Sequence, residues 1–525
     1  MIKNEKSLQK WFLQHIKDDG NPYFLDKHQA KIILDSHKNT LVTARAGSGK
    51  TRTIVAKIIF LLSYRQIPPE EIIVFAFNRK AKIEINERLS KITCDDQSVL
   101  ASQHEIATTF HAFAYKIIGG KEAVGKKLIS ESQENDIITR IIRSAIPAAG
   151  ELNLSDFTKE IETAKQFITR AEQKYFADYN ILDDLIEEKQ REPTSDNAIQ
   201  TKLVILNNVL KEYQRQLREA GLINFNQMMA QAAERLRGKV TPFSHIFVDE
   251  YQDFSLLFLN LIQSLRNTCP DAHLLCVGDD WQAINRFAGS DVEYFIHFAK
   301  YFPEDYTRLF IPTNYRSGKK IVKNANYFMS RAIGDYQGCK TGSKQRSKIY
   351  VKNINYGQYS SNNLPLLLEN YLYTSLDIIK DNPGKTIKIL SRNNNLSFNG
   401  WSLERYITTL RNLAVKEHII DVTSAEGLIS GLTIHRSKGL EADIVILLEI
   451  DAEKFPGKDK SGGLYEIFGD TTENLFADEA RLFYVALTRP KEKLYILSKT
   501  TIVTKEKQRL NFFHYLNDDW LEELN

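Results

Sequence analysis

A glycine-rich segment near the N-terminus has the residue types of a phosphate-binding loop. A short β-branched run at residues 40–43 leads into Ala44-Arg45-Ala46-Gly47-Ser48-Gly49-Lys50-Thr51, and an apolar-periodic stretch follows at residues 53–62. In such a strand–loop–helix context, glycines let backbone N–H groups converge on phosphate oxygens, and the helix N-terminus adds partial positive charge. Lys50 would meet the β- and γ-phosphates of a nucleotide, and the Thr51 hydroxyl would ligate Mg²⁺.

One position of this loop departs from the general pattern GxxxxGK[ST], because Ala44 stands where glycine is expected. The alternative interpretation is a glycine-rich turn that binds nothing. The strand before the loop and the helix after it favour the phosphate loop.

A pair of carboxylates follows a second apolar run. Residues 245–248 read as a buried strand, and Asp249 and Glu250 come directly after it. The C-terminal end of a parallel strand is where nucleotide hydrolases hold Mg²⁺ and the attacking water. Asp249 would hold Mg²⁺ through water, and Glu250 would orient and deprotonate the attacking water. The alternative is an acidic loop that caps the next helix, which the phosphate loop upstream disfavours.

Six short apolar runs predict the strands that must position these residues. They form two groups, residues 40–43, 72–75, 245–248 and 274–277, and then residues 387–390 and 444–448. Runs of this length, rich in β-branched residues, are typical of buried parallel strands. We therefore expect two α/β domains.

Residues 120–216 have a different pattern. Apolar residues recur there at helical spacing, for example at 134–143 and 203–217, and no strand-like run interrupts them. This pattern predicts a helical insertion within the first α/β domain.

Composition excludes several classes of protein. The 525 residues suffice for about three to four compact units. The net charge of +4 is too mild to prove nucleic-acid binding and does not exclude a local basic channel. The four cysteines have no zinc-binding spacing, and they suit a reducing compartment. No apolar run is long enough for a membrane span and no signal peptide is evident, so we expect a cytoplasmic protein without a membrane partner.

Residues 249–253 resemble motif II of superfamily 1 DNA helicases of the UvrD/Rep/PcrA type, and the other motifs of that family follow in order. The matching segments are residues 25–29 (Q motif), 74–81 (Ia), 109–113 (Ib), 277–289 (III), 314–317 (IV), 433–441 (V) and 481–489 (VI). The resemblance covers about residues 25–497, and the motif sequences are most similar to those of the helicase IV branch. It implies an α/β fold with two RecA-like P-loop domains.

The resemblance implies an ATP site with named roles. Arg316 and Arg489 would both touch the γ-phosphate, with Arg489 as the arginine finger, and Gln282 would sense the same phosphate. With Lys50, Asp249 and Glu250, these residues form the expected catalytic set. Around the nucleotide, Gln29 would read the adenine edge, Tyr315 would stack on the adenine, Arg52 would lie near the base and triphosphate, and Glu441 would accept from the ribose.

The resemblance also places candidate contacts to single-stranded DNA, which proteins grip by aromatic stacking and phosphate contacts. The candidates are Phe77, Arg79, Thr109, Phe110, His111, Phe287, His435 and Arg436. Motif III departs from the processive members, because Asn285 replaces a tyrosine and Ala288 replaces an arginine. Another departure is Asn224-Phe225-Asn226-Gln227, where the family has an Asp-Phe-rich segment.

The motif positions predict domain boundaries. We expect domain 1A at residues 1-119 and 217-300, the helical 1B insertion at 120-216, and domain 2A at 301-525. Family members insert a further domain, 2B, between the strand ending at Leu390 and motif V at Thr433. That interval is short here, so we expect 2B, at about 391-430, to be missing or vestigial. Few residues follow Arg489, so we expect no nuclease domain.

These features predict a DNA-dependent ATPase that uses ATP and Mg²⁺. The leading hypothesis is a single-stranded DNA translocase or helicase of 3′→5′ polarity, acting on single strands and junctions with double-stranded DNA, and weakly processive alone. The alternative is an ATP- or DNA-sensing regulatory subunit of a separate nuclease, for example in an anti-phage defence complex. DNA repair and antiviral defence both remain open as pathways.

Overall fold

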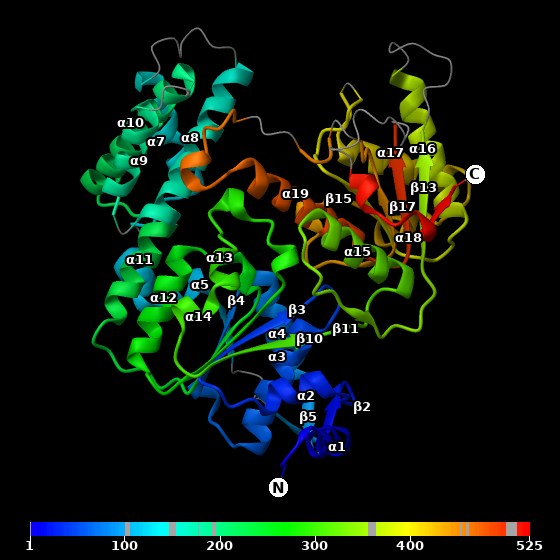
Figure 1. Ribbon diagram of the computed structural model, residues 1–525, viewed down its shortest axis with the longest axis horizontal. Coiled ribbons are helices and arrows are strands. Elements are labelled where there is room, and N and C mark those ends of the chain that lie inside the picture. Colours follow the sequence, from blue (N-terminus) through cyan, green and yellow to red (C-terminus); the bar gives the residue numbers. More distant parts are fainter. Residues whose placement is uncertain are drawn as a thin grey trace. The chain divides into compact units, whose positions relative to one another are not determined.

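The computed structural model divides into two compact units (Figure 1). It describes residues 2–99, 105–125, 127–145, 154–176, 178–191, 196–354, 364–398, 400–451, 454–457, 461–499 and 512–524. The first unit comprises residues 1–43, 50–310 and 461–471, and the second comprises residues 44–49, 311–460 and 472–525.

A six-stranded sheet with the order β10-β3-β9-β8-β4-β7 forms the centre of the first unit. Its strands are β3 (Asn39–Ala44), β4 (Ile72–Ala76), β7 (Ala107–Thr109), β8 (His245–Val248), β9 (His273–Gly278) and β10 (Tyr306–Ile311). The neighbours from β3 to β7 pair in parallel. All four strands predicted for this part are confirmed. Because β10 joins the same sheet, the first unit extends to Phe310, beyond the boundary expected at residue 300.

Helices on this sheet bury an apolar core. The longer ones are α2 (Lys27–Leu34), α3 (Lys50–Ile59), α4 (Arg79–Ser90), α5 (Phe110–Ile117), α11 (Phe225–Leu236) and α12 (Leu256–Thr268); α13 (Glu293–Ile296) and α14 (Phe298–Tyr301) are short. The core includes Val248 and Cys276 from the strands and Phe113 and Leu261 from the helices. The predicted helix at 53–62 is α3 followed by one π-helical turn, Phe60–Tyr64.

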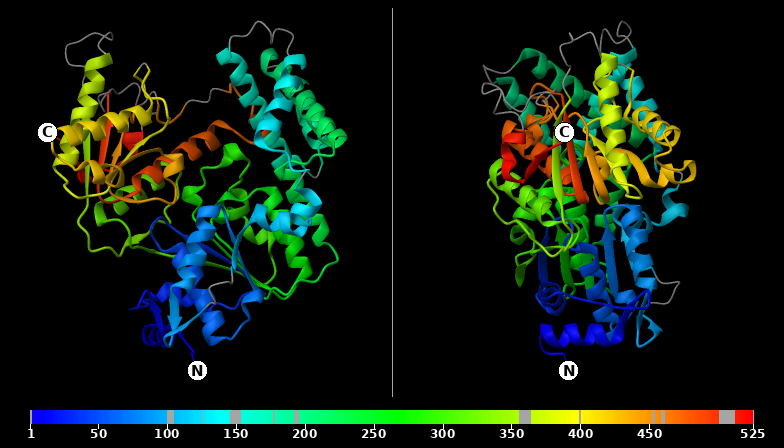
Figure 2. Two further views of the ribbon diagram at one scale, coloured as in Figure 1. Left: turned by 180° about the vertical axis from the view of Figure 1, so that it is seen from behind. Right: turned by 90° about the vertical axis from the view of Figure 1, so that its right-hand side faces the viewer.

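A small N-terminal subdomain also belongs to the first unit and is blue in Figure 2. It consists of α1 (Glu5–His15) and an antiparallel sheet of order β2-β1-β5-β6. The strands are β1 (Ile16–Asp18), β2 (Asn21–Pro22), β5 (Ile92–Cys94) and β6 (Gln97–Ser98). Its strands have only two or three residues, so no periodicity in the sequence revealed them.

Helices alone form the region expected as an insertion, as far as residues 120–216 are described. They are α6 (Gly120–Val124), α7 (Glu131–Ala145), α8 (Leu154–Tyr175), α9 (Asn180–Arg191) and α10 (Asn197–Ala220). The helices predicted at 134–143 and 203–217 are thus confirmed as parts of α7 and α10. These helices have their own core, which also takes in Leu464, Tyr465 and Phe468 from the segment at residues 461–471 (Figure 1).

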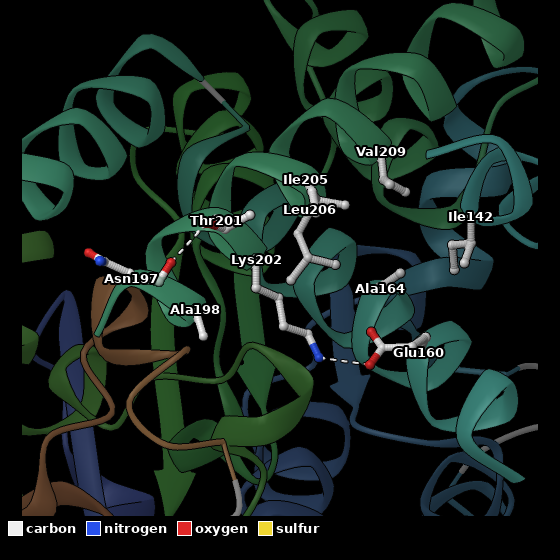
Figure 3. Close-up of a pocket in the computed structure, with 10 residues that line it drawn as sticks. All are labelled: Ile142, Glu160, Ala164, Asn197, Ala198, Thr201, Lys202, Ile205, Leu206 and Val209. Atoms are coloured by element: carbon white, nitrogen blue, oxygen red, sulfur yellow. Dashed lines mark hydrogen bonds and ion pairs between the residues drawn. The ribbon is translucent and has the colours of Figure 1, made fainter. Parts of the chain in front are cut away.

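A pocket of about 520 Å³ opens between α7, α8 and α10 (Figure 3). Its walls are mostly aliphatic, with Ile142, Leu206 and Val209 among them, and the ion pair between Lys202 and Glu160 (2.9 Å) crosses one side. None of the residues that the sequence analysis assigned to a nucleotide or DNA site lines it.

The second unit contains another six-stranded sheet, of order β15-β14-β16-β17-β13-β18, and all its neighbouring strands pair in parallel. Its strands are β13 (Lys348–Asn353), β14 (Ile387–Ser391), β15 (Ile429–Thr433), β16 (Ala442–Leu447), β17 (Pro490–Ser498) and β18 (Leu521–Glu523). The helices are α15 (Lys319–Ala332), α16 (Leu364–Lys380), α17 (Leu403–Lys416), α18 (Val422–Leu428) and α19 (Thr472–Leu487). A two-stranded parallel ladder joins β11 (Thr313–Asn314) to β12 (Lys340–Thr341). The strands predicted at 387–390 and 444–448 are confirmed, and so is the α/β fold class.

The interval expected to hold a vestigial 2B domain contains α17 and α18. Leu403, Tyr406 and Leu410 of α17 are buried in the core under β14 and β16. Since β14 and β15 are parallel neighbours, α17 serves as the crossover helix between them. This packing supports the expectation of a missing 2B domain, which stays a prediction. No helix in the described ranges is long and apolar enough to cross a membrane.

Candidate nucleotide and DNA site

The glycine-rich loop leaves the end of β3 and runs into the first turn of α3. Gly47 (φ 71°) and Gly49 (φ 84°) have left-handed backbone conformations, which glycine adopts without strain. A Cβ atom on Gly47 would lie 2.7 Å from Cβ of Arg316, so a side chain there would displace its neighbour. Ala44 ends the buried strand without a positive φ, and for this reason the position does not require glycine.

Within the second unit, residues 44–49 lie against the segment matched to motif IV. Asn314 Nδ2 donates to Ala46 O at 2.6 Å, and the Tyr315 N–H donates to Gly47 O at 2.8 Å. The Arg45 side chain is only 1% exposed, and its guanidinium lies 3.2 Å from Asp335. The Arg45 side chain is thus engaged inside the second unit, and a contact of Arg45 with phosphate, which stays a prediction, would use its backbone.

The loop has an unsatisfied hydroxyl. Ser48 is fully buried, and among the described residues nothing forms a hydrogen bond with its Oγ. A buried polar group without a partner is rare, and a phosphate oxygen would accept from this hydroxyl. The residues present thus fit a bound triphosphate.

Lys50, the first residue of α3, pairs with the second carboxylate of motif II. Its Nζ lies 3.2 Å from Glu250 Oε2. Burial opposes the charge on Lys50, but Glu250, Asp279 and Asp249 together raise its pKa above the ordinary value. Lys50 is therefore charged at neutral pH and is surrounded by carboxylates that an anionic ligand would partly replace.

Asp249 is almost fully buried at the end of β8. Burial and the neighbouring Glu250 carboxylate raise its pKa, and Lys50 partly offsets this effect. A divalent cation would relieve the repulsion between the two carboxylates. Thr51 and Asp249 offer the oxygen ligands that Mg²⁺ prefers. Among the residues described, no group of three or more His, Cys, Asp and Glu could hold a metal ion, so phosphate and water would have to complete such a site.

A chain of hydrogen bonds connects motif II to motif III. Gln252, fully buried, donates from Nε2 to Glu250 Oε2 (2.5 Å) and accepts at Oε1 from the Asp279 N–H (2.8 Å). Gln282 Nε2 in turn donates to Asp279 Oδ2 at 2.5 Å. A Cβ atom on Gly278 would lie 2.5 Å from Gln252 Oε1, so glycine is required for this close approach.

Glu250 itself has a left-handed backbone (φ 53°), which is uncommon for a residue with a side chain and is frequent at functional sites. Its carboxylate is held by Lys50 on one side and Gln252 on the other. The structure therefore brings together Lys50, Asp249, Glu250 and Gln282, as the sequence predicted.

In the second unit, motifs IV, V and VI meet. Arg316 Nε lies 2.7 Å from Glu441 Oε2 and its NH1 donates to Thr488 O, while Glu441 also pairs with Lys491 at 3.0 Å. Burial works to raise the pKa of Glu441, but Arg316 and Lys491 bring it below the ordinary value. Glu441 is thus an ionised partner of two cations here, and its expected contact with a ribose stays a prediction.

Arg489 is the second residue after α19 and is 1% exposed. Its Nε donates to Val485 O (2.8 Å) and its NH1 to Leu440 O (3.1 Å). Both acceptors are neutral carbonyl oxygens, which fix the guanidinium without neutralising its charge. The reach of Arg316 and Arg489 to a γ-phosphate stays a prediction.

Gln29 and Tyr315 were expected to contact the adenine, and Arg52 to lie near the base and triphosphate. Gln29 is buried on α2, where its Oε1 accepts from the Asp26 N–H in a capping box, so an adenine contact would use its NH₂ group. Lys57 of α3 donates to Ile32 O (3.1 Å) and Asp35 O (2.7 Å), and so fastens the end of α2 to the phosphate-loop helix. Tyr315 is 44% exposed, which leaves a ring face for stacking.

The candidate DNA contacts differ in their exposure. Phe287 is 49% exposed, Phe77 is partly exposed, and Arg79 and Arg436 lie on the surface. His111 and His435 are partly buried, and burial lowers the pKa of both, so both favour the neutral form. Thr109 uses its hydroxyl to accept from the Ala112 N–H at the start of α5.

Phe110 is the clear correction. It is 2% exposed and stacks on Phe75 and Phe258, with ring centroids 4.7 and 4.4 Å away. At the first position of α5 its side chain points into the core, so it offers no ring face to a base.

Phe225, which the sequence analysis named only within a departure from the family pattern, is a further exposed aromatic residue beside a candidate DNA contact. It is 51% exposed at the start of α11, and it contacts His111 edge to face at 5.5 Å. An aromatic directly after the helix cap Asn224 was the available signal, since the first turn of a capped helix is commonly accessible.

Two family models match the chain. The UvrD/REP helicase N-terminal domain matches residues 25–303, more than half of the chain, and the UvrD-like helicase C-terminal domain matches residues 399–501. The chain belongs to the UvrD/Rep helicase family. The first match includes the Q motif, the phosphate loop and motifs Ia, Ib, II and III, and the second includes motifs V and VI, whereas motif IV at residues 314–317 lies between the two matched regions.

Relatives in this family carry helicase names. DNA helicase IV of Escherichia coli is 28% identical over 507 residues, which cover 90% of this chain and 68% of that protein. ATP-dependent DNA helicase PcrA of Staphylococcus epidermidis is 26% identical over 58% of this chain, and UvrD1 of Mycobacterium leprae is 26% identical over 59% of it. The chain spans only 39% and 40% of those two relatives.

One departure from the UvrD/Rep pattern, Asn224, has a structural reason. Asn224 caps α11, and its Nδ2 lies 2.9 Å from both oxygens of Glu172 on α8; Asn226 Nδ2 donates to Glu172 as well (2.8 Å). Glu172 is 1% exposed. An aspartate at position 224 would set one carboxylate against another, whereas asparagine supplies a donor.

This buried group predicts a pH-dependent stability. Burial raises the pKa of Glu172 to about 7, although Asn226 and Asn224 favour its charged form; Glu134 across the cluster raises it further. Because the pKa of Glu172 is higher in the folded than in the unfolded protein, protonation of Glu172 stabilises the fold. This stabilisation is complete below about pH 4.5 and is lost as the pH rises through about 7.

We therefore expect Glu172→Gln to match the wild type in stability near pH 5 and to be more stable near pH 8, by about 2 kcal/mol. Denaturant unfolding at both pH values measures this difference. Glu162→Gln, an exposed position on the same helix, is the matched control and should show no such change. Equal shifts in both variants would contradict the assignment to Glu172.

Proposed function

We propose that this chain is an ATP- and Mg²⁺-dependent motor that moves along single-stranded DNA, with 3′→5′ polarity by family resemblance. The observation that carries the proposal is the hydrogen-bonded chain from Lys50 and Glu250 through Gln252 and Asp279 to Gln282. It links the residues suited to hydrolysis with the segment that leads to the exposed Phe287.

The phosphate-loop residues would act first. When ATP binds, Lys50 exchanges Glu250 for phosphate oxygens, and Glu250 becomes available to accept a proton from water. Mg²⁺, held by Thr51 and Asp249, would supply positive charge to the phosphate oxygens. Gln252 keeps the Glu250 carboxylate in place during this exchange.

The same hydrogen bonds would report the nucleotide state. A shift of Glu250 pulls on Gln252, and Gln252 is bonded to the backbone of Asp279. Asp279 holds Gln282, and the turn Arg286–Ala288 that bears Phe287 follows a few residues later. Stacking of bases on Phe287 and Phe77 would thus change with each turnover. Asn285 and Ala288 offer weaker contacts to DNA than the tyrosine and arginine of processive members. We therefore expect the protein to dissociate after moving only a short distance along DNA.

The test measures ATPase activity and strand displacement on one preparation. We expect ATPase activity to rise at least about tenfold with single-stranded DNA, at low salt because phosphate contacts are salt-sensitive. Strand displacement should be weak, because we expect the 2B domain that would engage duplex to be missing, and it should be stronger on 3′-tailed than on 5′-tailed duplexes. Unwinding of long duplexes by the isolated protein would contradict the second expectation.

The regulatory alternative predicts a different result in the same assay. A sensor would bind ATP and DNA without sustained turnover. Nucleotide binding with an ATPase rate that DNA leaves unchanged would therefore favour it over the motor.

A further inference from the structure

Tyr23, which directly follows β2 of the N-terminal subdomain, contacts the phosphate-loop helix at Arg52. This residue lies just before residue 25, where the match to the UvrD/REP helicase N-terminal domain begins. Tyr23 is 1% exposed, packs against Phe12 of α1 at 5.6 Å, and donates its N–H to Ile16 O. The subdomain thus holds both the ring and the backbone of Tyr23.

Tyr23 holds Arg52 in two ways. Arg52 Cζ lies 4.2 Å from the centroid of the Tyr23 ring, and the Tyr23 hydroxyl donates to Arg52 O at 3.0 Å. The neighbouring Phe24 O accepts from Arg52 NH2 at 3.2 Å. Backbone and guanidinium of Arg52 are therefore both held by residues 23 and 24.

The guanidinium of Arg52 is held in place, but its positive charge is not neutralised. A tyrosine ring and a carbonyl oxygen are uncharged, and no carboxylate forms an ion pair with Arg52 among the described residues. Arg52 stands in the first turn of α3, directly after Lys50 and Thr51. A cation oriented at the N-terminus of this helix is prepared to meet an anionic or polar ligand without losing further side-chain freedom.

We propose that Tyr23 is a positioning residue for the nucleotide site, which it serves by orienting Arg52 toward the base and triphosphate of ATP. This rests on the proposed role of Arg52 in nucleotide binding. Residues 5–22 of the N-terminal subdomain, which carry α1, β1 and β2, precede the matched family region, and the subdomain then forms a supporting wall of the ATP site. Tyr23 does not touch the nucleotide, so its loss acts through Arg52.

The test uses steady-state ATPase kinetics of the full chain with saturating single-stranded DNA. Tyr23→Leu removes both the ring face and the hydroxyl, and should raise KM for ATP about tenfold with kcat within about twofold of wild type. Tyr23→Phe keeps the ring face and should raise KM about threefold or less. Arg52→Ala should raise KM at least as much as Tyr23→Leu, and the double variant should show no further increase, because both changes remove the same interaction.

Trp11→Leu is the matched control. Trp11 belongs to the same subdomain and packs against Tyr64 at 5.5 Å without contacting Arg52. It should leave KM unchanged even if the unfolding temperature falls. If Trp11→Leu raises KM as much as Tyr23→Leu, the effect is general loosening of the subdomain and the proposal is overturned.

Two further outcomes separate this inference from the proposed function. A raised KM in Arg52→Ala with an unchanged KM in Tyr23→Leu would reject Tyr23 and keep Arg52 at the nucleotide. An unchanged KM in Arg52→Ala would reject the role of Arg52, and the positioning role with it, even if the chain remains a DNA-stimulated ATPase. Additive effects in the double variant would also overturn the proposal.

Discussion

Replacing Arg489 by alanine should lower the DNA-stimulated ATPase rate about 10³-fold with little change in ATP affinity. An arginine finger acts on charge that develops in the transition state, so its loss reduces kcat far more than it weakens ground-state binding. The carbonyl oxygens of Val485 and Leu440 hold the Arg489 guanidinium in a fixed position, as such a role requires.

Turnover and affinity must be measured separately, the first by steady-state hydrolysis and the second by equilibrium nucleotide titration. Arg489→Lys keeps a charge but loses the planar fork, so we expect it to restore only a small part of the rate. Arg405→Ala is the control, because that guanidinium stacks on Trp401 (4.5 Å) and has no expected role. A large loss of ATP affinity at unchanged turnover would make Arg489 a ground-state ligand.

Removal of Arg489 also deletes its hydrogen bonds to Val485 O and Leu440 O, which contribute about 1 kcal/mol of stability each. The unfolding temperature of each variant must therefore be recorded with the kinetics. Arg489→Lys offers a donor in the same region, so a rate loss shared by both variants cannot be attributed to unfolding alone.

The sequence predicted those parts of the fold that residues adjacent in the chain determine. The strand at residues 245–248 is a continuous apolar run, and Asp249 and Glu250 follow it directly, so strand and carboxylates could be placed together. The phosphate loop was likewise predicted from adjacent residues, including Lys50 at the start of α3. In both cases adjacent residues carry the whole signal.

Signals that depend on distant partners were not visible. Glu172 and Asn224 come together from different helices, and only the fold shows why asparagine suits that position. Arg45 belongs to the loop motif, yet its side chain pairs with Asp335 far along the chain. Phe110 is part of a DNA-associated motif, but the first position of α5 faces the core. Motif matching identifies a residue's neighbourhood without fixing the direction of its side chain.

The second large effect is expected at Glu250. Glu250→Gln should lower the hydrolysis rate about 10²-fold or more and preserve ATP binding, because the amide keeps the shape of the side chain but cannot accept a proton from water. Gln252 and Lys50 hold the Glu250 carboxylate in the structure, so the reaction has a base whose position is already fixed. Single-turnover hydrolysis measures the chemical step directly.

The same substitution has a second consequence that sharpens the test. The Glu250 charge raises the pKa of Asp249, so its removal should lower that pKa and favour the ionised Asp249 that a divalent cation requires. ATP affinity in the presence of Mg²⁺ should therefore stay equal to that of the wild type or increase. Glu304→Gln, an exposed carboxylate of the same unit that pairs with Lys38, is the control and should alter neither quantity. Near wild-type hydrolysis in Glu250→Gln would remove Glu250 from the chemical step, whereas a loss of binding together with hydrolysis would make it a structural partner of Lys50.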